Sequence, residues 1–281
     1  MADPHAAGVY ALERDTLSVR GPDRKAWLDG LLTCAVTAVS EATAAYGLLL
    51  TKQGKIVTDA FLADNGQELL VGVAPGQGAA VRALLDRYLV MEDAELDVPS
   101  SPVVWLLGPG LTDAAAGVVA RGTLTLGSWQ TQLQVSTDAP ATLPDAADLL
   151  AEQGLGIYGI DFGERDNPHE ASLDRIAVSW TKGCYLGQEV VCMQDMRGKV
   201  KRRLVALDDS GALLGAAASA TPLEVLSADG SVAGLVSSVH AAPQGARVLA
   251  SISTSALESQ AALSLLGEEL RVAFGGAPKL S

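Results

Sequence analysis

The spacing of apolar residues changes near residue 203 and so divides the chain into two parts. Before that point, short apolar runs typical of strands are mixed with segments of helical spacing. Residues 79–89 repeat apolar side chains every three or four positions, which places them on one face of a helix that can cover a sheet. The sequence therefore predicts an α+β region over residues 1–203. Its expected strands are 46–50, 56–62 and 68–73, with a hairpin turn at 51–55.

One local pattern occurs twice within this α+β region. Residues 17–23 and residues 103–109 each contain a strand-like run that ends in a Gly-Pro turn. An amphipathic run follows each turn, one up to Leu32 and one near residues 111–119, and both runs are predicted helices because proline is tolerated where a helix starts. The repeat predicts two related α+β halves.

After residue 203 the chain consists of short β-like runs separated by turn signals. Strands of this length and spacing are typical of a small barrel or sandwich. We therefore expect a domain boundary near Arg203, with a second domain over residues 204–281 and a loose tail after Phe274. The predicted strands are 204–207, 223–226, 232–239, 248–252 and 270–274.

Composition and charge limit the classes of partner. The formal net charge of −13 opposes generic binding to nucleic acid or to anionic membranes, because like charges repel. No run reaches the roughly 18 consecutive apolar residues of a membrane span. Residues 1–10 contain an acid and a proline but no apolar run, so we expect neither a signal peptide nor a transit peptide. The three cysteines form no C-x-x-C pair, which favours a reducing compartment and predicts a cytoplasmic protein.

The densest group of candidate chemistry lies in residues 181–189, after a strand-like run at 176–180. Gly183 and Gly187 allow the backbone to approach a ligand closely. The polar and aromatic side chains between them supply a cation, a stacking ring and hydrogen-bonding groups, which suit a flat polar heterocycle. The candidate ligand-binding residues here are Lys182, Tyr185, Gln188 and Glu189.

Cys184 is the candidate reactive group of the same segment. Its thiolate gains stability if Lys182 lies near the sulfur or if a helix begins at Gly187. The alternative is a half-buried structural cysteine in a turn, and that interpretation applies more strongly to Cys34 and Cys192.

Other kinds of site lack their sequence patterns. Cys184 and Cys192 are far apart in sequence with no histidine nearby, and His5, His169 and His240 are dispersed, so no zinc or cluster site is expected. The sequence also contains no Ser-His-Asp triad pattern, Walker loop or G-x-G-x-x-G motif. Phosphoryl transfer and dinucleotide binding are therefore disfavoured.

Residues 197–203 concentrate basic side chains within an otherwise acidic chain. Such a cluster suits an anionic partner, for example a polyglutamate tail, an acidic protein or an RNA phosphate. A solvated strand end is an equally good interpretation. The residues concerned are Arg197, Lys199, Lys201, Arg202 and Arg203.

Residues 182–189 match the K-G-C-Y-x-G-Q-E signature of YgfZ-like folate-binding proteins without a substitution. Residues 168–170 and 197–199 extend the match, and residues 234–239 resemble the G-x-V-T-S barrel strand of that family. The chain thus resembles the YgfZ-like family, which is related to the glycine-cleavage T protein. The resemblance implies an aminomethyltransferase fold, in which two ferredoxin-like α+β units and a small C-terminal β-barrel surround a central opening that holds tetrahydrofolate.

The resemblance also implies a function. It predicts a tetrahydrofolate-binding accessory protein for the assembly, maintenance or repair of iron–sulfur enzymes, including enzymes that thiomethylate tRNA. Cys184 is then the functional thiol, and iron–sulfur enzymes or assembly proteins are the partners. Transfer RNA is then an indirect target, because the charge of the whole chain and the lack of a known RNA-binding motif disfavour direct binding.

Two carboxylates are implied as folate ligands. The segment around Glu152 resembles the R-L-E-A-G segment in which a glutamate contacts the pterin, and a carboxylate can accept two N–H bonds from an amino-pyrimidine edge. Asp59 is the one acid kept from the G-G-x-x-D-D stretch of the aminomethyltransferase. The alternative function, a folate-dependent one-carbon transferase, is disfavoured because the acid pair is incomplete. Other departures from the family pattern are Cys34, Ala35, Cys192, Met193 and Gln194.

Overall fold

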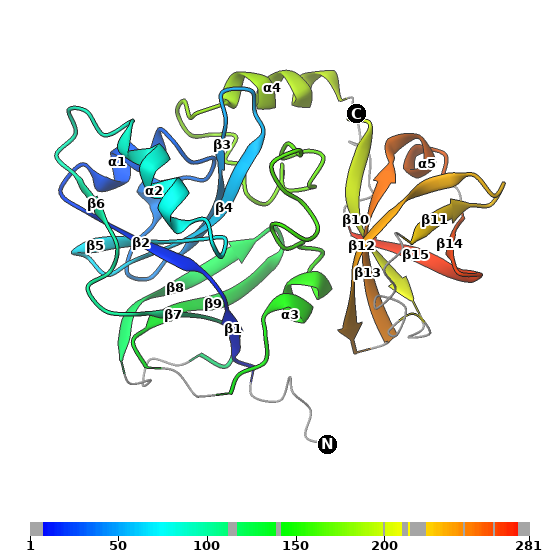
Figure 1. Ribbon diagram of the computed structural model, residues 1–281, viewed down its shortest axis with the longest axis horizontal. Coiled ribbons are helices and arrows are strands. Elements are labelled where there is room, and N and C mark those ends of the chain that lie inside the picture. Colours follow the sequence, from blue (N-terminus) through cyan, green and yellow to red (C-terminus); the bar gives the residue numbers. More distant parts are fainter. Residues whose placement is uncertain are drawn as a thin grey trace. The chain divides into compact units, whose positions relative to one another are not determined.

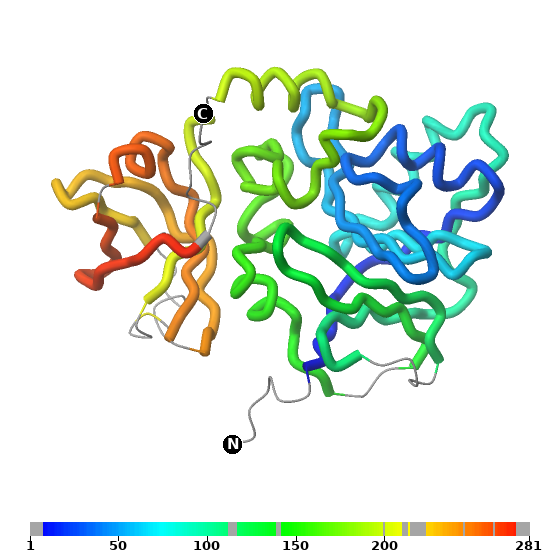
Figure 2. Tube along the Cα trace, turned by 180° about the vertical axis from the view of Figure 1, so that it is seen from behind, coloured from blue at the N-terminus to red at the C-terminus, as the bar shows by residue number. Residues whose placement is uncertain are grey.

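The chain folds into two compact units in a computed structural model (Figure 1, Figure 2). The first unit comprises Met1–Ala146 and Arg175–Gln188, and the second comprises Ala147–Asp174 and Glu189–Ser281. The domain boundary at residue 203 stays a prediction, because contacts between segments of the folded chain do not show which segments fold independently. The structure describes residues 8–111, 117–138, 142–198, 200–209, 213, 223–243, 245–260 and 262–274.

A five-stranded antiparallel sheet with the order β3-β4-β5-β2-β6 forms one half of the first unit. The predicted hairpin, the following strand and the helix after it are all confirmed. Val81 and Leu85 of that helix are buried, and Leu84 and Tyr88 pack against the same core, as the spacing requires. The elements are β2 (Asp15–Arg20), α1 (Arg24–Asp29), a 3₁₀ turn at Val36–Ala38, β3 (Ala45–Leu50), β4 (Ile56–Asp64), β5 (Glu68–Val73), α2 (Gly78–Asp86) and β6 (Glu95–Asp97).

A second antiparallel sheet, with the order β1-β7-β9-β8, completes the first unit. Trp105 of this sheet packs so closely over Gly72 of the first sheet that a Cβ there would lie 2.7 Å from its ring. The Trp105 indole N–H also donates to Thr16 Oγ1 at 2.9 Å, which satisfies the polar edge of a buried ring. The strands are β1 (Tyr10–Leu12), β7 (Val104–Leu107), β8 (Val118–Leu126) and β9 (Trp129–Ser136).

The helix predicted near residues 111–119 is wrong at its C-terminal end, because residues 118 and 119 begin strand β8. Burial alternates along β8, with Ala120, Leu124 and Leu126 on the inner face, which is the period of a strand. Residues 112–116 lie outside the described residues.

A closed barrel with the strand order β10-β13-β12-β11-β14-β15 forms the larger part of the second unit. Each strand predicted after residue 203 overlaps one of these strands, whereas β14 is only three residues long and gave no recognisable pattern. The predicted loose tail lies outside the described residues. The elements are β10 (Arg202–Asp209), β11 (Glu224–Ser227), β12 (Val232–Ala242), β13 (Gly245–Ser253), α5 (Thr254–Glu258), β14 (Leu263–Leu265) and β15 (Glu268–Phe274).

The remaining described helices are α3 (Ala147–Glu152) and α4 (Gln188–Arg197). The strand predicted at residues 176–180 is wrong, because these residues form an irregular segment that begins in a turn. Ala177 and Val178 are buried, and a short apolar run has the same appearance in a buried loop as in a strand. Among the described residues, no helix has the length and apolar character needed to cross a membrane.

Candidate functional site

The signature loop, residues 181–187, is fastened to the first unit by the ammonium group of Lys182. Its Nζ donates to the carbonyl oxygens of Leu32 at 2.9 Å and Cys34 at 2.7 Å, and also to the carbonyl oxygen of Asp29. It pairs with Asp29 Oδ1 at 3.3 Å, and the Lys182 side chain is only 4% exposed. These carbonyls lie at and just beyond the end of α1, where a cation is favourable.

Burial sets the ionisation of the groups around this anchor. It lowers the pKa of Lys182, while the Asp29 carboxylate opposes the shift. Burial also raises the pKa of the Cys34 thiol to about 12, although the nearby Lys182 charge acts against it. Cys34 therefore remains a neutral thiol at physiological pH, in agreement with the structural role that the sequence favoured.

The signature loop also packs tightly against neighbouring backbone. The Leu186 N–H donates to the Gly30 carbonyl oxygen at 3.1 Å. Gly187 has a φ of +81°, and a Cβ there would lie 2.5 Å from the Thr51 carbonyl oxygen in the hairpin turn. Only glycine combines this backbone conformation with such a close approach. The loop is therefore a rigid part of the first unit.

Some side chains of the signature are buried in the first unit, and others are exposed to solvent. Tyr185 is 6% exposed, and its ring lies 5.6 Å from Lys182 Nζ, so both side chains belong to the packing of the first unit. Cys184 and Glu189 are exposed and Gln188 is half-buried. Helix α4 begins at Gln188, directly after the loop. The loop therefore presents a thiol to solvent from a fixed backbone.

Asp59 lies in the interior of the first unit. Its Oδ1 pairs with Arg14 Nη1 at 2.7 Å, and both side chains are at most 5% exposed. The Tyr46 hydroxyl donates to the other carboxylate oxygen at 3.3 Å, and burial raises the pKa of Tyr46 well above its ordinary value. The Arg14 guanidinium also stacks over Phe61 at 4.7 Å. Asp59 is thus enclosed by its own neighbours rather than open to a ligand.

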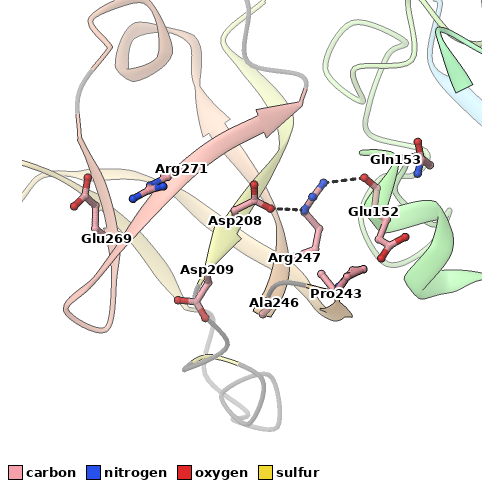
Figure 3. A pocket seen from close by; sticks show the side chains of 10 residues that line it. Glu152, Gln153, Asp208, Asp209, Pro243, Ala246, Arg247, Glu269 and Arg271 are labelled. Atoms are coloured by element: carbon pink, nitrogen blue, oxygen red, sulfur yellow. Dashed lines mark hydrogen bonds and ion pairs between the residues drawn. The ribbon is translucent and has the colours of Figure 1, made fainter. Parts of the chain in front are cut away.

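Glu152 ends helix α3 in the second unit, and Arg247 of the barrel holds that end of the helix (Figure 3). Arg247 Nη1 donates to the Glu152 carbonyl oxygen at 2.9 Å, and Arg247 Nε pairs with Asp208 Oδ1 at 2.9 Å. At the other end of α3, His240 Nδ1 lies 3.0 Å from Asp148 Oδ1. The barrel therefore fixes the helix at both ends.

A cavity of about 610 Å³ opens beside Glu152, within the second unit (Figure 3). Glu152 Oε1 is buried and has no hydrogen-bond partner among the described residues. A buried carboxylate oxygen without a partner is costly, so it fits a ligand that supplies an N–H donor. The volume is in the range of small-molecule sites. The lining residues are Glu152, Gln153, Asp208, Asp209, Ala242, Pro243, Ala246, Arg247, Glu269 and Arg271.

The basic cluster is partly neutralised within the second unit. Arg202 pairs with Asp166 at 2.7 Å, and Arg203 pairs with Asp174 at 3.1 Å. Arg197 and Lys201 are exposed. Lys199 lies outside the described residues. Because Arg202 and Arg203 are paired internally, a smaller part of the cluster is available to an anionic partner than the sequence suggests.

One group of possible cation ligands was missed at the sequence level. His169, Asp174 and Asp195 each bring one ligand atom to within 4.8 Å of the other two. Burial lowers the pKa of His169, which keeps its imidazole neutral, but the guanidinium of Arg203 already pairs with Asp174. These residues are separated in sequence with no metal-binding spacing, so no sequence signal could have grouped them.

Curated relatives of the chain are iron–sulfur cluster assembly factors and tRNA-modifying proteins. It is 29% identical over 241 residues to human iron–sulfur cluster assembly factor IBA57, mitochondrial, with 72% of this chain and 67% of that protein covered. It is 25% identical over 236 residues to the tRNA-modifying protein YgfZ of Colwellia psychrerythraea, with 73% and 72% covered. The chain spans only 53% to 57% of three fungal IBA57 homologues.

A solved structure shows which fold the chain shares. Glycine cleavage system aminomethyltransferase T from Bartonella henselae matches with a TM-score of 0.70 over 98% of this chain and 89% of that chain, at 15% sequence identity. No protein-family model matches the sequence. The relatives and the shared fold bear out the resemblance found in the signature: the chain is similar to YgfZ and IBA57 proteins and is built on the aminomethyltransferase fold.

Proposed function

We propose that this protein is a tetrahydrofolate-binding accessory factor for the assembly, maintenance or repair of iron–sulfur enzymes, including enzymes that thiomethylate tRNA. The observation that carries the proposal is the exposed Cys184, which stands on a loop fixed by the buried Lys182. The names of the relatives, an iron–sulfur cluster assembly factor and a tRNA-modifying protein, support an iron–sulfur role.

Glu152 supports the folate part of the proposal. Its buried, unpartnered Oε1 can accept an N–H from the amino-pyrimidine edge of a pterin. Arg271 lines the same cavity and offers a cation to a carboxylate of the ligand. Bound tetrahydrofolate supplies a carrier for one-carbon units. The protein contributes by holding α3 in place through Arg247.

Cys184 is the proposed point of reaction or partner contact. Replacement of the chromosomal gene with a Cys184→Ala version should lower the activity of tRNA-thiomethylating iron–sulfur enzymes. A Cys192→Ala strain is the matched control, since Cys192 is half-buried in α4. Full activity in the Cys184→Ala strain, with normal protein levels, would refute the role of the thiol.

The second candidate, a one-carbon transferase, rests on Asp59. Because Arg14 and Tyr46 enclose that carboxylate, it is poorly placed to orient a substrate amine. We expect no methylene-tetrahydrofolate from glycine-cleavage, dimethylglycine or sarcosine-type donors. Measurable product from any of them would favour the transferase over the accessory role.

The proposed function also includes a binding surface for an acidic partner and a cellular location. An acidic partner would meet Arg197 and Lys201 rather than the internally paired Arg202 and Arg203. We propose a cytoplasmic location and an indirect link to tRNA through client enzymes. Tight, steeply salt-dependent binding of the purified protein to tRNA would contradict that indirect link.

A further inference from the structure

A β-bulge in strand β12 turns two polar side chains to the outside of the barrel. Val236 and Val239 both pack against the barrel core although they are three positions apart. The register shifts between Val236 and Ser238, which inserts one extra residue and reverses the alternation of faces. Ser238 and His240 therefore share the outer face of the strand, and bulges of this kind often re-aim side chains at functional sites.

These two side chains connect two carboxyl groups of the second unit by hydrogen bonds. His240 Nδ1 lies 3.0 Å from Asp148 Oδ1, and His240 Nε2 lies 2.9 Å from Ser238 Oγ. The Ser238 hydroxyl lies 2.6 Å from Asp161 Oδ1. The series runs from Asp148, whose side chain is 42% exposed, to Asp161, which is 9% exposed. We call Asp148, His240, Ser238 and Asp161 the relay.

The buried end of the relay faces a cavity. Asp161 lines a cavity of about 430 Å³ formed by residues 158–166, and its Oδ2 accepts the Ile157 N–H at 2.8 Å. Burial raises the pKa of Asp161, while the hydrogen bonds from Ser238 and Ile157 and the charge of His240 oppose the shift. Such a carboxyl can exchange a proton closer to neutral pH than an ordinary aspartate.

The charged groups around the relay favour a cationic ligand. Glu164 and Asp166 line the cavity with Asp161, against the single guanidinium of Arg165, although Asp166 also pairs with Arg202. At the Asp148 end of the relay, Arg247 of strand β13 lies opposite His240 in the backbone register of the barrel. The cavity therefore suits a small molecule with a basic nitrogen, such as a primary amine.

The hydrogen bonds can hold a proton at either end of the relay. In one arrangement His240 Nε2–H donates to Ser238 and the Ser238 hydroxyl donates to an Asp161 carboxylate. In the other, a protonated Asp161 donates to Ser238 and the Ser238 hydroxyl donates to His240 Nε2. The Nδ1–H of His240 donates to Asp148 in both. The two arrangements contain the same number of protons, so a proton crosses the relay without breaking it.

We propose that Asp161 is an acid–base group for an amine bound in this cavity, and that Ser238 and His240 connect it to solvent at Asp148. The Asp161 carboxylate takes a proton from the ligand ammonium. That proton passes to Ser238 Oγ while the Ser238 proton passes to Nε2 of the neutral His240 ring. The resulting imidazolium releases its Nδ1 proton to water at the Asp148 end, so the ligand loses one proton, the solvent gains one and His240 is left neutral. Neither Glu152 nor its cavity takes part, so this proposal is independent of the folate proposal.

The coupling within the relay is testable by NMR of the whole chain labelled at the aspartate carboxyl carbons. Loss of the Asp161 signal in Asp161→Asn identifies it. In the wild type we expect this carbon to titrate above the ordinary aspartate range. Ser238→Ala and His240→Gln should each move the midpoint further upward, because each removes a group that favours the carboxylate. Ser237→Ala, at the neighbouring position of β12, should leave it unchanged. If the titration midpoint of Asp161 is the same in wild type, Ser238→Ala and His240→Gln, the proposed relay is wrong.

The ligand is tested separately with benzylamine as the probe. Calorimetric titration at neutral pH in two buffers of different ionisation enthalpy measures both binding and the protons released. We expect wild type to bind benzylamine with proton release and Asp161→Asn to bind at least tenfold more weakly. Absence of binding to wild type, or equal binding by a folded Asp161→Asn variant, would overturn the assignment of an amine site.

Discussion

The signature loop of the first unit and helix α3 of the second unit are both held by a buried cation that binds backbone carbonyls, yet they present different chemistry. Lys182 fixes the loop beside α1 and leaves the Cys184 thiol exposed. Arg247 fixes the end of α3 and leaves a carboxylate oxygen of Glu152 buried without a partner. A polar residue in a sequence signature can therefore act by positioning a neighbour rather than by touching a ligand.

The largest loss in the free energy of unfolding is expected when the buried ion pair between Arg14 and Asp59 is broken. Arg14→Met leaves the Asp59 charge without its partner in the interior. The free energy of unfolding should fall by about 3–5 kcal/mol, the usual cost of breaking a buried ion pair. Denaturant titration measures it, with the exposed Arg87→Met as the control. A loss below about 1 kcal/mol would mean that the interior tolerates the unpaired charge, contrary to an enclosed Asp59.

Lys182→Met tests the anchor of the signature loop. The change leaves the carbonyls of Asp29, Leu32 and Cys34 without their shared donor, and we expect a loss of about 3 kcal/mol in the free energy of unfolding. Amide exchange in residues 181–187 should also become faster. Lys52→Met, at an exposed position of the hairpin turn, serves as the control. Unchanged exchange in the loop would show that Lys182 is not its anchor.

The two signature glycines give a matched pair of variants with a smaller effect. Gly187→Ala places a Cβ 2.5 Å from the Thr51 carbonyl oxygen at a positive φ, whereas a Cβ at Gly183 meets nothing within 4 Å. We expect Gly187→Ala to lower the free energy of unfolding by about 2 kcal/mol and Gly183→Ala to change it by less than about 0.5 kcal/mol. Equal effects measured by thermal or denaturant unfolding would contradict the close packing of the loop on the hairpin.

The smallest predicted change is in how the free energy of unfolding depends on pH, and it comes from the second unit. The described histidines, His169 and His240, both belong to the second unit. Burial lowers the pKa of His169 from its ordinary value of 6.5, so the unfolded chain binds a proton before the folded chain does. Stability from this group is present above pH 6.5 and is lost as pH falls below it. His169→Gln should reduce that loss in denaturant titrations between pH 7 and pH 5, and an identical pH dependence would count against the buried neutral imidazole.

The parts of the fold that the sequence predicted are those with regular periodicity. The β3–β4 hairpin, helix α2 and most barrel strands carry patterns of period two or 3.6 that burial requires. The irregular segment at residues 176–180 and the start of β8 were missed because short apolar runs do not distinguish loop, helix and strand. In each case the wider packing decides the local conformation.

The candidate site was predicted only in part. The signature identified Cys184 and its loop, and the family resemblance pointed to Glu152, which lines a cavity. The inward direction of Lys182 and Tyr185 depends on the packing of the first unit, which the loop sequence does not contain. The relay was not predictable, because His240 and Asp148 are 92 positions apart and a bulge decides which way His240 faces.

Calorimetric titration of tetrahydrofolate under anaerobic conditions tests the central claim most directly. Wild type, Cys184→Ala and Glu258→Gln, an exposed carboxylate of α5, should bind with similar affinity. Glu152→Gln should bind at least tenfold more weakly, since a hydrogen bond to a charged group contributes about 1.5–3 kcal/mol. Absence of binding to wild type, or equal affinity in a folded Glu152→Gln variant, would contradict the assignment of Glu152 as the folate ligand.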